Sequence, residues 1–146
     1  IKRFGEVPRK DQHYRIRPGV YALLPRDGQL LLTCQYDPAP DFQLPGGGID
    51  PNEAPIPALH REVVEETGWK ISTPRRVGAF RRFVYMPEYD LWAEKICHIY
   101  LARPVLCLGA PTEDGHSALW MPAQAASRIL GNAGDRHFCK LLSDCS

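Results

Sequence analysis

Three glutamates crowd one face of a predicted helix in the segment REVVEETGW, residues 61–69. At about 100° of rotation per residue, Glu62, Glu65 and Glu66 fall within an arc of about 100°. Like charges three or four positions apart destabilise a helix by about 0.2–0.5 kcal/mol per pair. Arg61 can pair with Glu65 one turn later, so a solvated acidic face is one interpretation. A site that gathers cations is the other.

The residues on either side of the acids fix the bounds of this helix. Pro55 and Pro57 are tolerated only in or before a first helical turn, so the regular helix is predicted to begin between residues 52 and 56. Gly68 suits the position just beyond a helix, which should therefore end at Thr67. Apolar residues of the same helix border the acidic arc, so the carboxylates are predicted to line a groove beside the core.

The remaining segments alternate between strand and helix patterns. The Asp27-Gly28 pair joins two apolar runs and predicts a hairpin of antiparallel strands. Residues 38–57 are dense in proline and glycine and are expected to form a loop that contains one short strand. Asp135 is the expected N-cap of the last helix. Strands are predicted over residues 19–24, 29–35, 42–44, 75–87, 91–105 and 117–122, and further helices over 122–132 and 135–144. This order indicates a layered α/β or α+β domain.

Length and composition restrict the class of protein. A chain of 146 residues can bury a substantial core, so a single domain over residues 1–146 is expected. The formal net charge of +1 gives no global basic field for a long nucleic acid. No apolar stretch approaches the roughly 20 residues that span a bilayer. The five cysteines form no CxxC pair, and Cys34 and Cys97 are expected to be buried, which favours a reducing cytoplasm. The chain begins with Ile1, so a native leader could have been trimmed away.

Fixed spacings extend the acidic run into a longer motif. The segment GGGIDPNEAPIPALHREVVEETGW fits the pattern G-x5-E-x7-R-E-U-x-E-E-x-G-U, where U is a bulky apolar residue. The fixed positions are Gly47, Glu53, Arg61, Glu62, Glu65, Glu66 and Gly68, and the apolar ones are Val63 and Trp69. This motif, residues 47–69, resembles the Nudix box, and the chain resembles MutT-like Nudix hydrolases over residues 17–130. The resemblance implies an α/β/α sandwich with a mixed central sheet.

The same resemblance assigns a metal site to the acids. It implies that Glu62, Glu65 and Glu66 bind Mg²⁺, or Mn²⁺ in its place, together with the backbone carbonyl of Gly46 or Gly47. The chemistry agrees, because a diphosphate repels an attacking water until hard cations neutralise its charge, and Mg²⁺ prefers oxygen ligands. Bound cations would then offset the repulsion among the crowded carboxylates.

Supporting and proton-transfer roles follow from the resemblance in turn. Arg61 and Glu53 are expected to form an ion pair that braces the loop against the helix, although Arg61 as a phosphate-binding cation is an alternative. The general base is expected to be Glu65 or Glu113, because family members use either an acid of the box or one on a later loop. His116 is a further titratable group near that loop, although a lone loop histidine is more often structural.

Substrate contacts are predicted from polar residues at the ends of the strands. The candidates are Arg15, Arg17, Gln35, Gln43 and Arg81. The predicted activity is Mg²⁺-dependent hydrolysis of a phosphoanhydride in a nucleoside diphosphate linked to another moiety, most of all a modified nucleoside triphosphate. Alternatives are ADP-ribose, a nucleotide sugar, a dinucleoside polyphosphate, or a non-catalytic nucleotide-binding domain. RNA is disfavoured by the neutral charge. The partner is therefore a small nucleotide, and family members are monomers or homodimers.

Overall fold

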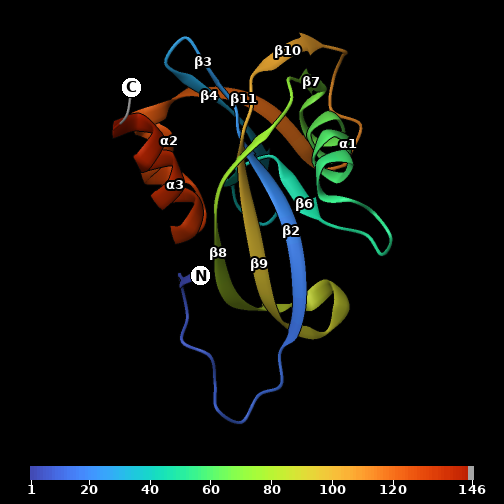
Figure 1. The fold of residues 1–146 in the computed structure, drawn as a ribbon, viewed down its shortest axis with the longest axis vertical. Helices are drawn as coiled ribbons and strands as arrows, with labels where there is room; N and C mark the ends of the chain where they lie inside the picture. Colours follow the sequence, from blue (N-terminus) through green and yellow to red (C-terminus); the bar gives the residue numbers. More distant parts are fainter. Residues whose placement is uncertain (145–146) are drawn as a thin grey trace.

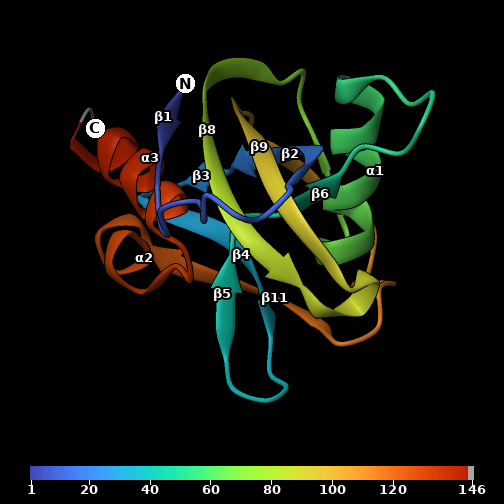
Figure 2. The same ribbon diagram turned by 90° about the horizontal axis from the view of Figure 1, so that it is seen from below.

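The strands form a layer between α1 on one side and α2 and α3 on the other, in a computed structural model that describes residues 1–144 (Figures 1 and 2). This α/β arrangement with a mixed sheet confirms the predicted fold class. The helices are α1 (Pro55–Thr67), α2 (Ala123–Ile129) and α3 (Ala133–Asp144), with a short 3₁₀ turn η1 (Pro87–Tyr89). The strands are β1 (Lys2–Arg3), β2 (Arg15–Leu23), β3 (Pro25–Arg26), β4 (Gln29–Gln35), β5 (Asp41–Gln43), β6 (Gly46–Gly48), β7 (Trp69–Ile71), β8 (Arg75–Met86), β9 (Leu91–Leu101), β10 (Pro104–Cys107) and β11 (His116–Pro122).

Two sheets and a small ribbon make up the strand layer. The larger sheet has the order β1-β8-β9-β2-β6, in which β2 runs parallel to β9 and antiparallel to β6. In the smaller sheet β4 lies between β11 and β3 and also pairs with β5. The ribbon consists of β10 and β7. The long β2 therefore places its side chains next to those of β9 in direct register, which determines the floor of the site.

The predicted hairpin is present, but its first strand pairs elsewhere. Asp27 and Gly28 both have positive φ and join β3 to β4 in a two-residue turn. Most of the expected strand 19–24 belongs to β2, which pairs with β9 and β6 rather than with β4. The chain thus passes from one sheet to the other between β2 and β3, and only the turn itself could be read from local sequence.

Two apolar clusters fill the spaces on either side of the larger sheet. One joins β2 to α1 through Val20, Ala22, Leu59 and Val63. The other joins the opposite face of the sheet to α2 and α3 and contains Phe80, Cys97, Ile99, Leu130 and Cys139. Cys97 is buried as predicted, and so is Cys34, and neither forms a disulfide. Side chains alternate across β2, so Tyr21, which lies between Val20 and Ala22, faces the second cluster.

Several predicted elements need correction. Gly46–Gly48 was expected to be a loop but forms β6, because three glycines can lie flat against β2. The expected strand 91–105 divides into β9 and β10. The last helix begins at Ala133, and its cap is Asn132, whose Oδ1 accepts a hydrogen bond from the Asp135 N–H at 2.8 Å. Asp135 is buried instead of capping the helix.

Candidate active site

The acids of α1 lie against the glycine strand β6. Glu66 is only 6% exposed, and its Oε1 accepts a hydrogen bond from the Gly46 N–H at 3.0 Å. Gly46 has a φ of 151°, and a Cβ at that position would collide with the Val20 carbonyl oxygen. Only glycine therefore allows β6 to approach both β2 and α1.

Gly47 makes room for a second acid. A Cβ built on Gly47 would lie 2.7 Å from the Cδ and Oε2 atoms of Glu62, closer than side-chain atoms approach one another. The missing side chain therefore lets the Glu62 carboxylate rest on the backbone of β6. Both glycines that were predicted to offer a carbonyl ligand thus lie beside a predicted carboxylate ligand, Gly46 beside Glu66 and Gly47 beside Glu62. Which carbonyl would bind an ion stays a prediction.

Arg61 is the cation around which the outer acids gather. Its Nε and Nη2 donate to the two oxygens of Glu53 at 2.7 and 2.8 Å, so the ion pair expected from the sequence is present and is bidentate. Its Nη1 lies 3.1 Å from Glu62 Oε1 and 3.2 Å from Glu65 Oε2. The hydrogen bonds from Arg61 hold the pKa of Glu53 down at about 2. Arg61 therefore links the loop before α1 to the acids of the helix.

The loop before β11 is fastened to the end of α1. The backbone N–H groups of Thr112 and Glu113 both donate to the Glu65 carbonyl oxygen, at 2.9 and 3.0 Å. The N–H of Leu108 donates to the Gly68 carbonyl oxygen at 2.7 Å. These bonds satisfy carbonyl groups at the helix end that have no partner within the helix. They also place the Glu113 side chain beside the acids of α1.

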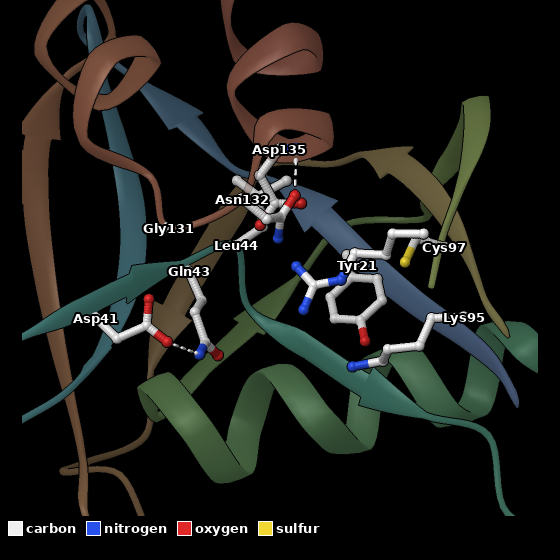
Figure 3. Close-up of a pocket in the computed structure, with 10 residues that line it drawn as sticks. Tyr21, Asp41, Gln43, Leu44, Lys95, Cys97, Gly131, Asn132 and Asp135 are labelled. Carbon is white, nitrogen blue, oxygen red and sulfur yellow. Dashed lines mark hydrogen bonds between the residues drawn. The ribbon is translucent and has the colours of Figure 1, made fainter. Parts of the chain in front are cut away.

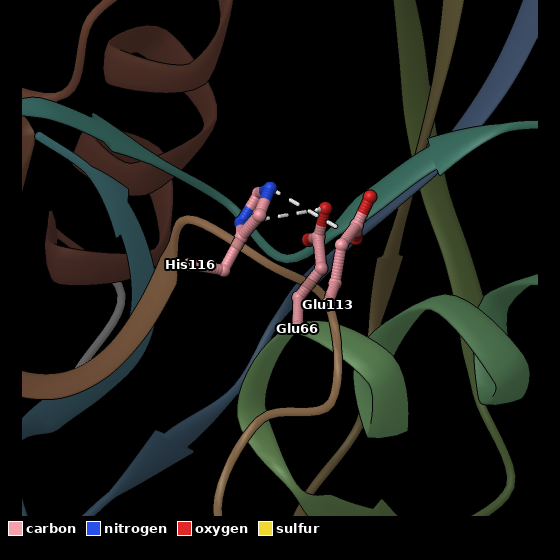
Figure 4. Close-up of side chains that lie close together, drawn as sticks. All are labelled: Glu66, Glu113 and His116. Carbon is pink, nitrogen blue, oxygen red and sulfur yellow. Dashed lines mark ion pairs between the residues drawn. The ribbon is translucent and has the colours of Figure 1, made fainter. Parts of the chain in front are cut away.

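Glu113 and His116 complete the cluster from the loop side. Figure 4 shows both side chains turned toward Glu66. His116 Nδ1 lies 3.8 Å from Glu66 Oε2 and 2.8 Å from the buried Thr33 Oγ1, and its Nε2 lies 3.8 Å from Glu113 Oε2. Nitrogen and oxygen atoms of Glu66, Glu113 and His116 lie within 4.8 Å of one another, and the same holds for oxygens of Glu62, Glu65 and Glu113. We call Glu62, Glu65, Glu66 and Glu113 the carboxylate cluster.

The two most buried acids of the cluster resist ionisation. Burial raises the pKa of Glu66 to about 8; the Gly46 N–H opposes this shift, and the nearby Glu62 and Glu113 add to it. Burial also raises the pKa of Glu62 to about 7, against the attraction of Arg61. A cation bound beside these carboxyl groups would favour their ionised form.

The donor set of the cluster fits a hard divalent metal. Carboxylate oxygens are the ligands that Mg²⁺ and Mn²⁺ prefer, and clustered acids facing a cavity leave space for water and for substrate oxygens. The identity of the ion is not fixed by these residues.

A cavity of about 610 Å³ opens on the carboxylate cluster. Glu62, Glu66 and Glu113 line one part of it, and Arg17 and Lys95 line another. A smaller hollow of about 150 Å³ adjoins it and shares Tyr21 and Lys95 with it. Figure 3 shows Lys95 and Tyr21 in this hollow, with Asp135 above them. A substrate at the carboxylates would therefore also meet the partly buried cations Arg17 and Lys95.

The predicted substrate contacts divide between this cavity and other surfaces. Arg17 lines the cavity and Gln43 lines the smaller hollow. Gln35 contacts Gln43, whose Nε2 donates to the Gln35 Oε1 at 3.4 Å. Arg15 is exposed at the start of β2. These placements leave the substrate roles of all four residues as predictions.

Arg81 stays a predicted substrate contact, although it lines neither of these two spaces. Its Nη1 donates to Glu94 Oε2 at 3.4 Å on the opposite face of β8 from Arg82, because neighbouring residues of a strand point to opposite faces. Arg82, not Arg81, lines the smaller hollow. The sequence offered two adjacent arginines and no signal to choose between them.

Three further residues at the site were missed or given another role by the sequence analysis. Lys95 lies within a predicted strand, but nothing in its neighbourhood marks it as functional. Asp135 was assigned to a helix cap and is instead 4% exposed beside the hollow. His116 was weighed as a possible acid or base against a structural role, and its side chain is 6% exposed within reach of two glutamates. Each is brought to the site by strand pairing or helix packing, which local sequence does not encode.

The family model for the NUDIX domain matches residues 13–142. The chain therefore belongs to the NUDIX domain family, as the motif over residues 47–69 predicts. The motif contains Glu62, Glu65 and Glu66, the three acids that α1 contributes to the carboxylate cluster.

Several relatives are named for activity on nucleotides. A putative 8-oxo-dGTP diphosphatase of Bacillus subtilis is 30% identical over 51% of this chain and 50% of its own length. A CMP-5'-(N-acetyl-N-hydroxy-3-aminopropyl)phosphonate hydrolase of Streptomyces rubellomurinus is 30% identical over 82% of this chain and 59% of its own. An RNA pyrophosphohydrolase of Helicobacter pylori is 38% identical over 38% of this chain and 39% of its own. The chain thus spans only about half the length of these relatives.

Solved structures share the fold at low sequence identity. A NUDIX hydrolase from Nitrosomonas europaea superposes with a TM-score of 0.70 at 20% identity, covering 86% of both chains. A MutT protein from Bacillus halodurans gives a TM-score of 0.72 at 19% identity, covering 87% of this chain and 82% of that one.

Among the described residues, no helix is long and apolar enough to cross a membrane.

Proposed function

We propose that this protein is a metal-dependent hydrolase that cleaves a phosphoanhydride bond in a nucleoside diphosphate linked to another moiety. The observation that carries the proposal is the carboxylate cluster, which faces a cavity of about 610 Å³ that is also lined by Arg17 and Lys95. Acids and cations on one cavity suit a ligand that brings both phosphates and a metal ion. Membership of the NUDIX family supports the same conclusion.

The residues of the cluster have separable roles in this proposal. Glu62, Glu65 and Glu66 would hold the metal, with the carbonyl of Gly46 or Gly47 as a further ligand. Mg²⁺, or Mn²⁺ in its place, supplies when bound the positive charge that offsets the phosphate oxygens. Arg61 orients the acids through its bonds to Glu53, Glu62 and Glu65. Arg17 and Lys95 would bind oxygens of the substrate.

Glu113 is the better supported of the two candidate bases. The Glu65 carboxylate already forms an ion pair with Arg61, and its backbone carbonyl accepts hydrogen bonds from the loop at Thr112 and Glu113. Glu113 instead projects from that loop among the other acids, and its Oε2 lies 3.8 Å from His116 Nε2. This position beside the predicted metal ligands suits Glu113 to accept a proton from an attacking water. Hydrogen bonding between Thr33 and His116 keeps the imidazole in place beside it.

A nucleoside triphosphate, including one with a modified base, is the favoured substrate. The name of the Bacillus subtilis relative supports it, whereas the names of other relatives point to a cytidine phosphonate and to RNA ends. ADP-ribose, nucleotide sugars and dinucleoside polyphosphates remain alternatives of the same reaction class. We further infer that residues 1–146 form one domain acting as a monomer or homodimer, and we expect a cytoplasmic location.

A substrate panel with and without metal tests the proposal. The protein would be incubated with dNTPs, oxidised dNTPs, ADP-ribose, a nucleotide sugar, a diadenosine polyphosphate and 5'-triphosphate RNA. The expected result is release of phosphate or pyrophosphate that requires Mg²⁺ or Mn²⁺ and is abolished by EDTA. Metal binding without turnover of any of these compounds would instead favour a non-catalytic nucleotide-binding domain.

A further inference from the structure

Three cations lie side by side across the larger sheet. Arg17 on β2 is directly opposite Lys95 on β9, and Lys95 is directly opposite Arg82 on β8. Residues in direct register on neighbouring strands share one face and lie about 4.5–5.5 Å apart at their Cβ atoms. We call these three residues the cationic row. They occupy the face that also carries Tyr21 and Cys97, toward α3.

Such a row is unfavourable without a ligand. Like charges directly opposite one another destabilise a sheet. Burial lowers the pKa of Lys95, and the neighbouring Arg82 lowers it further. Arg82 Nε is buried and has no hydrogen-bond partner among the residues that the structure describes. A buried donor that lacks a partner is rare in folded proteins and marks a place where an acceptor is missing.

One buried acid, Asp135, lies beside the row in the smaller hollow. Asp41 also lines the hollow, but it is exposed and its Oδ2 accepts a hydrogen bond from Gln43 Nε2 at 2.6 Å. Arg17 stacks on the Tyr89 ring, with 5.0 Å between the guanidinium carbon and the ring centroid. Glu62 and Glu66 line the main cavity with Arg17 and Lys95, but they belong to the carboxylate cluster that is proposed to hold the metal. Apart from that cluster, the three cations meet one buried acid among the described residues.

The row runs from the main cavity into the smaller hollow. Arg17 and Lys95 line the cavity of about 610 Å³ together with Glu62 and Glu66. Lys95 and Arg82 line the hollow of about 150 Å³. Lys95 therefore connects the two spaces. A phosphate chain held at the carboxylates would reach the row by extending toward Lys95.

We propose that the cationic row is an anion subsite that holds a phosphoryl or phosphonyl group of the substrate other than the phosphates at the carboxylate cluster. The substrate class is then a nucleotide that carries this additional anionic group, as nucleoside triphosphates do, rather than a nucleoside diphosphate linked to a neutral sugar. The assignment to a substrate rests on the proposed function, whereas anion binding by the row does not.

Binding of inorganic tripolyphosphate to the metal-free protein tests the row without any turnover. Titration calorimetry in EDTA would compare the wild-type protein with Arg17→Gln, Arg82→Gln and Arg82→Lys. We expect each Gln variant to weaken binding about tenfold or more, as the loss of one charge-assisted hydrogen bond would do, and Arg82→Lys to weaken it less. Arg76→Gln is the matched control, because Arg76 is an exposed arginine on the same strand that contacts His98. Equal affinity in all variants, or no binding by the wild-type protein, would overturn the subsite.

Substrate selectivity gives the second readout. The ratio of kcat/KM for a nucleoside triphosphate to kcat/KM for a nucleotide sugar is expected to fall about tenfold in Arg17→Gln and Arg82→Gln, and to stay at the wild-type value in Arg76→Gln. An unchanged ratio with normal turnover would refute the row and leave the proposed function standing. Absence of all turnover alongside tripolyphosphate binding that depends on the row would refute the function instead.

Discussion

The carboxylate cluster and the cationic row carry opposite charge and meet at one cavity and the hollow beside it, but the chain builds them in different ways. The cluster comes mainly from successive turns of α1, so three of its four acids lie within five positions of sequence. The row takes one residue from each of three strands, at positions 17, 82 and 95. A site on one helix can be recognised from the spacing of its residues in the sequence. A site across several strands can be recognised only when the pairing of those strands is known.

The two regions also differ in how their charge is managed. Arg61 ties Glu53, Glu62 and Glu65 into one network, and the glycines of β6 leave room for the carboxylates beside their backbone. Within residues 1–144 the row has no equivalent hub, and the buried Arg82 Nε has no hydrogen-bond partner. We therefore expect changes in the cluster to affect the chemical step, and changes in the row to affect which substrate is chosen.

Glu66→Gln should give the largest effect, about a thousandfold or greater loss of kcat/KM, comparable with losing a central electrostatic group of an active site. The side chain keeps its size, but the most buried carboxylate of the cluster is lost. Steady-state kinetics on an accepted nucleotide would measure it, with the exposed Glu6→Gln as control. Unchanged kcat in Glu66→Gln would show that the metal assignment is wrong.

Glu113→Gln should lower kcat by about 10²-fold or more, because removal of a general base typically costs 10²–10⁴-fold. Metal titration should show unchanged metal affinity in Glu113→Gln. Glu65→Gln should lower kcat through weaker metal binding, since its proposed role is at the metal. Weaker metal binding in Glu113→Gln alone would exchange the two assignments.

Arg61→Lys should reduce kcat/KM about 10–100-fold, as loss of a group that orients metal ligands does. Lysine keeps the charge but cannot form the two parallel bonds that the guanidinium makes to Glu53. Metal titration followed by kinetics would measure weaker metal binding as the cause. The control is Arg76→Lys, and equal metal affinity in Arg61→Lys and wild type would remove the orienting role.

Lys95→Met should raise KM for a nucleoside triphosphate about tenfold while leaving the ligand-free protein more stable by about 0.2–1 kcal/mol. The stabilisation is expected because the central charge of the row is removed from between two others. Urea unfolding in EDTA would give the free energy of unfolding. A destabilised protein with unchanged KM would make Lys95 a structural residue only.

A further prediction concerns how pH changes the stability of the metal-free fold. The pKa of Glu66 is about 8 in the folded protein against an ordinary value of 4.5, so the folded state binds the proton more tightly than the unfolded chain does. This contribution to stability is complete below pH 4.5 and is lost as pH rises through 8. Thermal unfolding in EDTA between pH 5 and pH 9 should therefore register a decline that Glu66→Gln reduces.

Metal should reverse that decline, because it binds the ionised carboxylates. Addition of Mg²⁺ should raise Tm more at pH 8 than at pH 6 in the wild-type protein and have little effect in Glu66→Gln. An equal rise in Tm at both pH values would contradict the link between the shifted carboxyls and the metal site.

Local spacing was sufficient to predict the helix and the acids that it carries. The prolines and Gly68 set the bounds of α1, and the two-residue turn at Asp27-Gly28 follows from the φ angles that these residues tolerate. The ion pair of Arg61 and Glu53 was also predictable, because the family resemblance implies it for these two motif positions; its bidentate geometry was not. These features depend on residues that are close in sequence.

Pairing between distant strands set the rest of the site. The choice of Arg82 over Arg81 depends on which face of β8 meets the cavity, and a shift of one residue reverses it. Asp135 reaches the hollow because α3 packs against the larger sheet, and the preceding Asn132 takes over the cap. The role of Gly46–Gly48 as a strand follows from contacts with β2 on one side and α1 on the other, which no local pattern records.

The fastening of the loop before β11 to α1 limits how this part of the chain can vary in length. The anchors at Leu108 and Thr112 leave only residues 109–111 between them, and both are held by carbonyl groups at one helix end. An inserted residue in this span would have to bulge outward or release Glu113 from the acids. Insertions after Glu113, where Asp114 and Gly115 are exposed, would leave the anchors intact. We therefore expect relatives to differ in length after this glutamate and to keep the spacing before it.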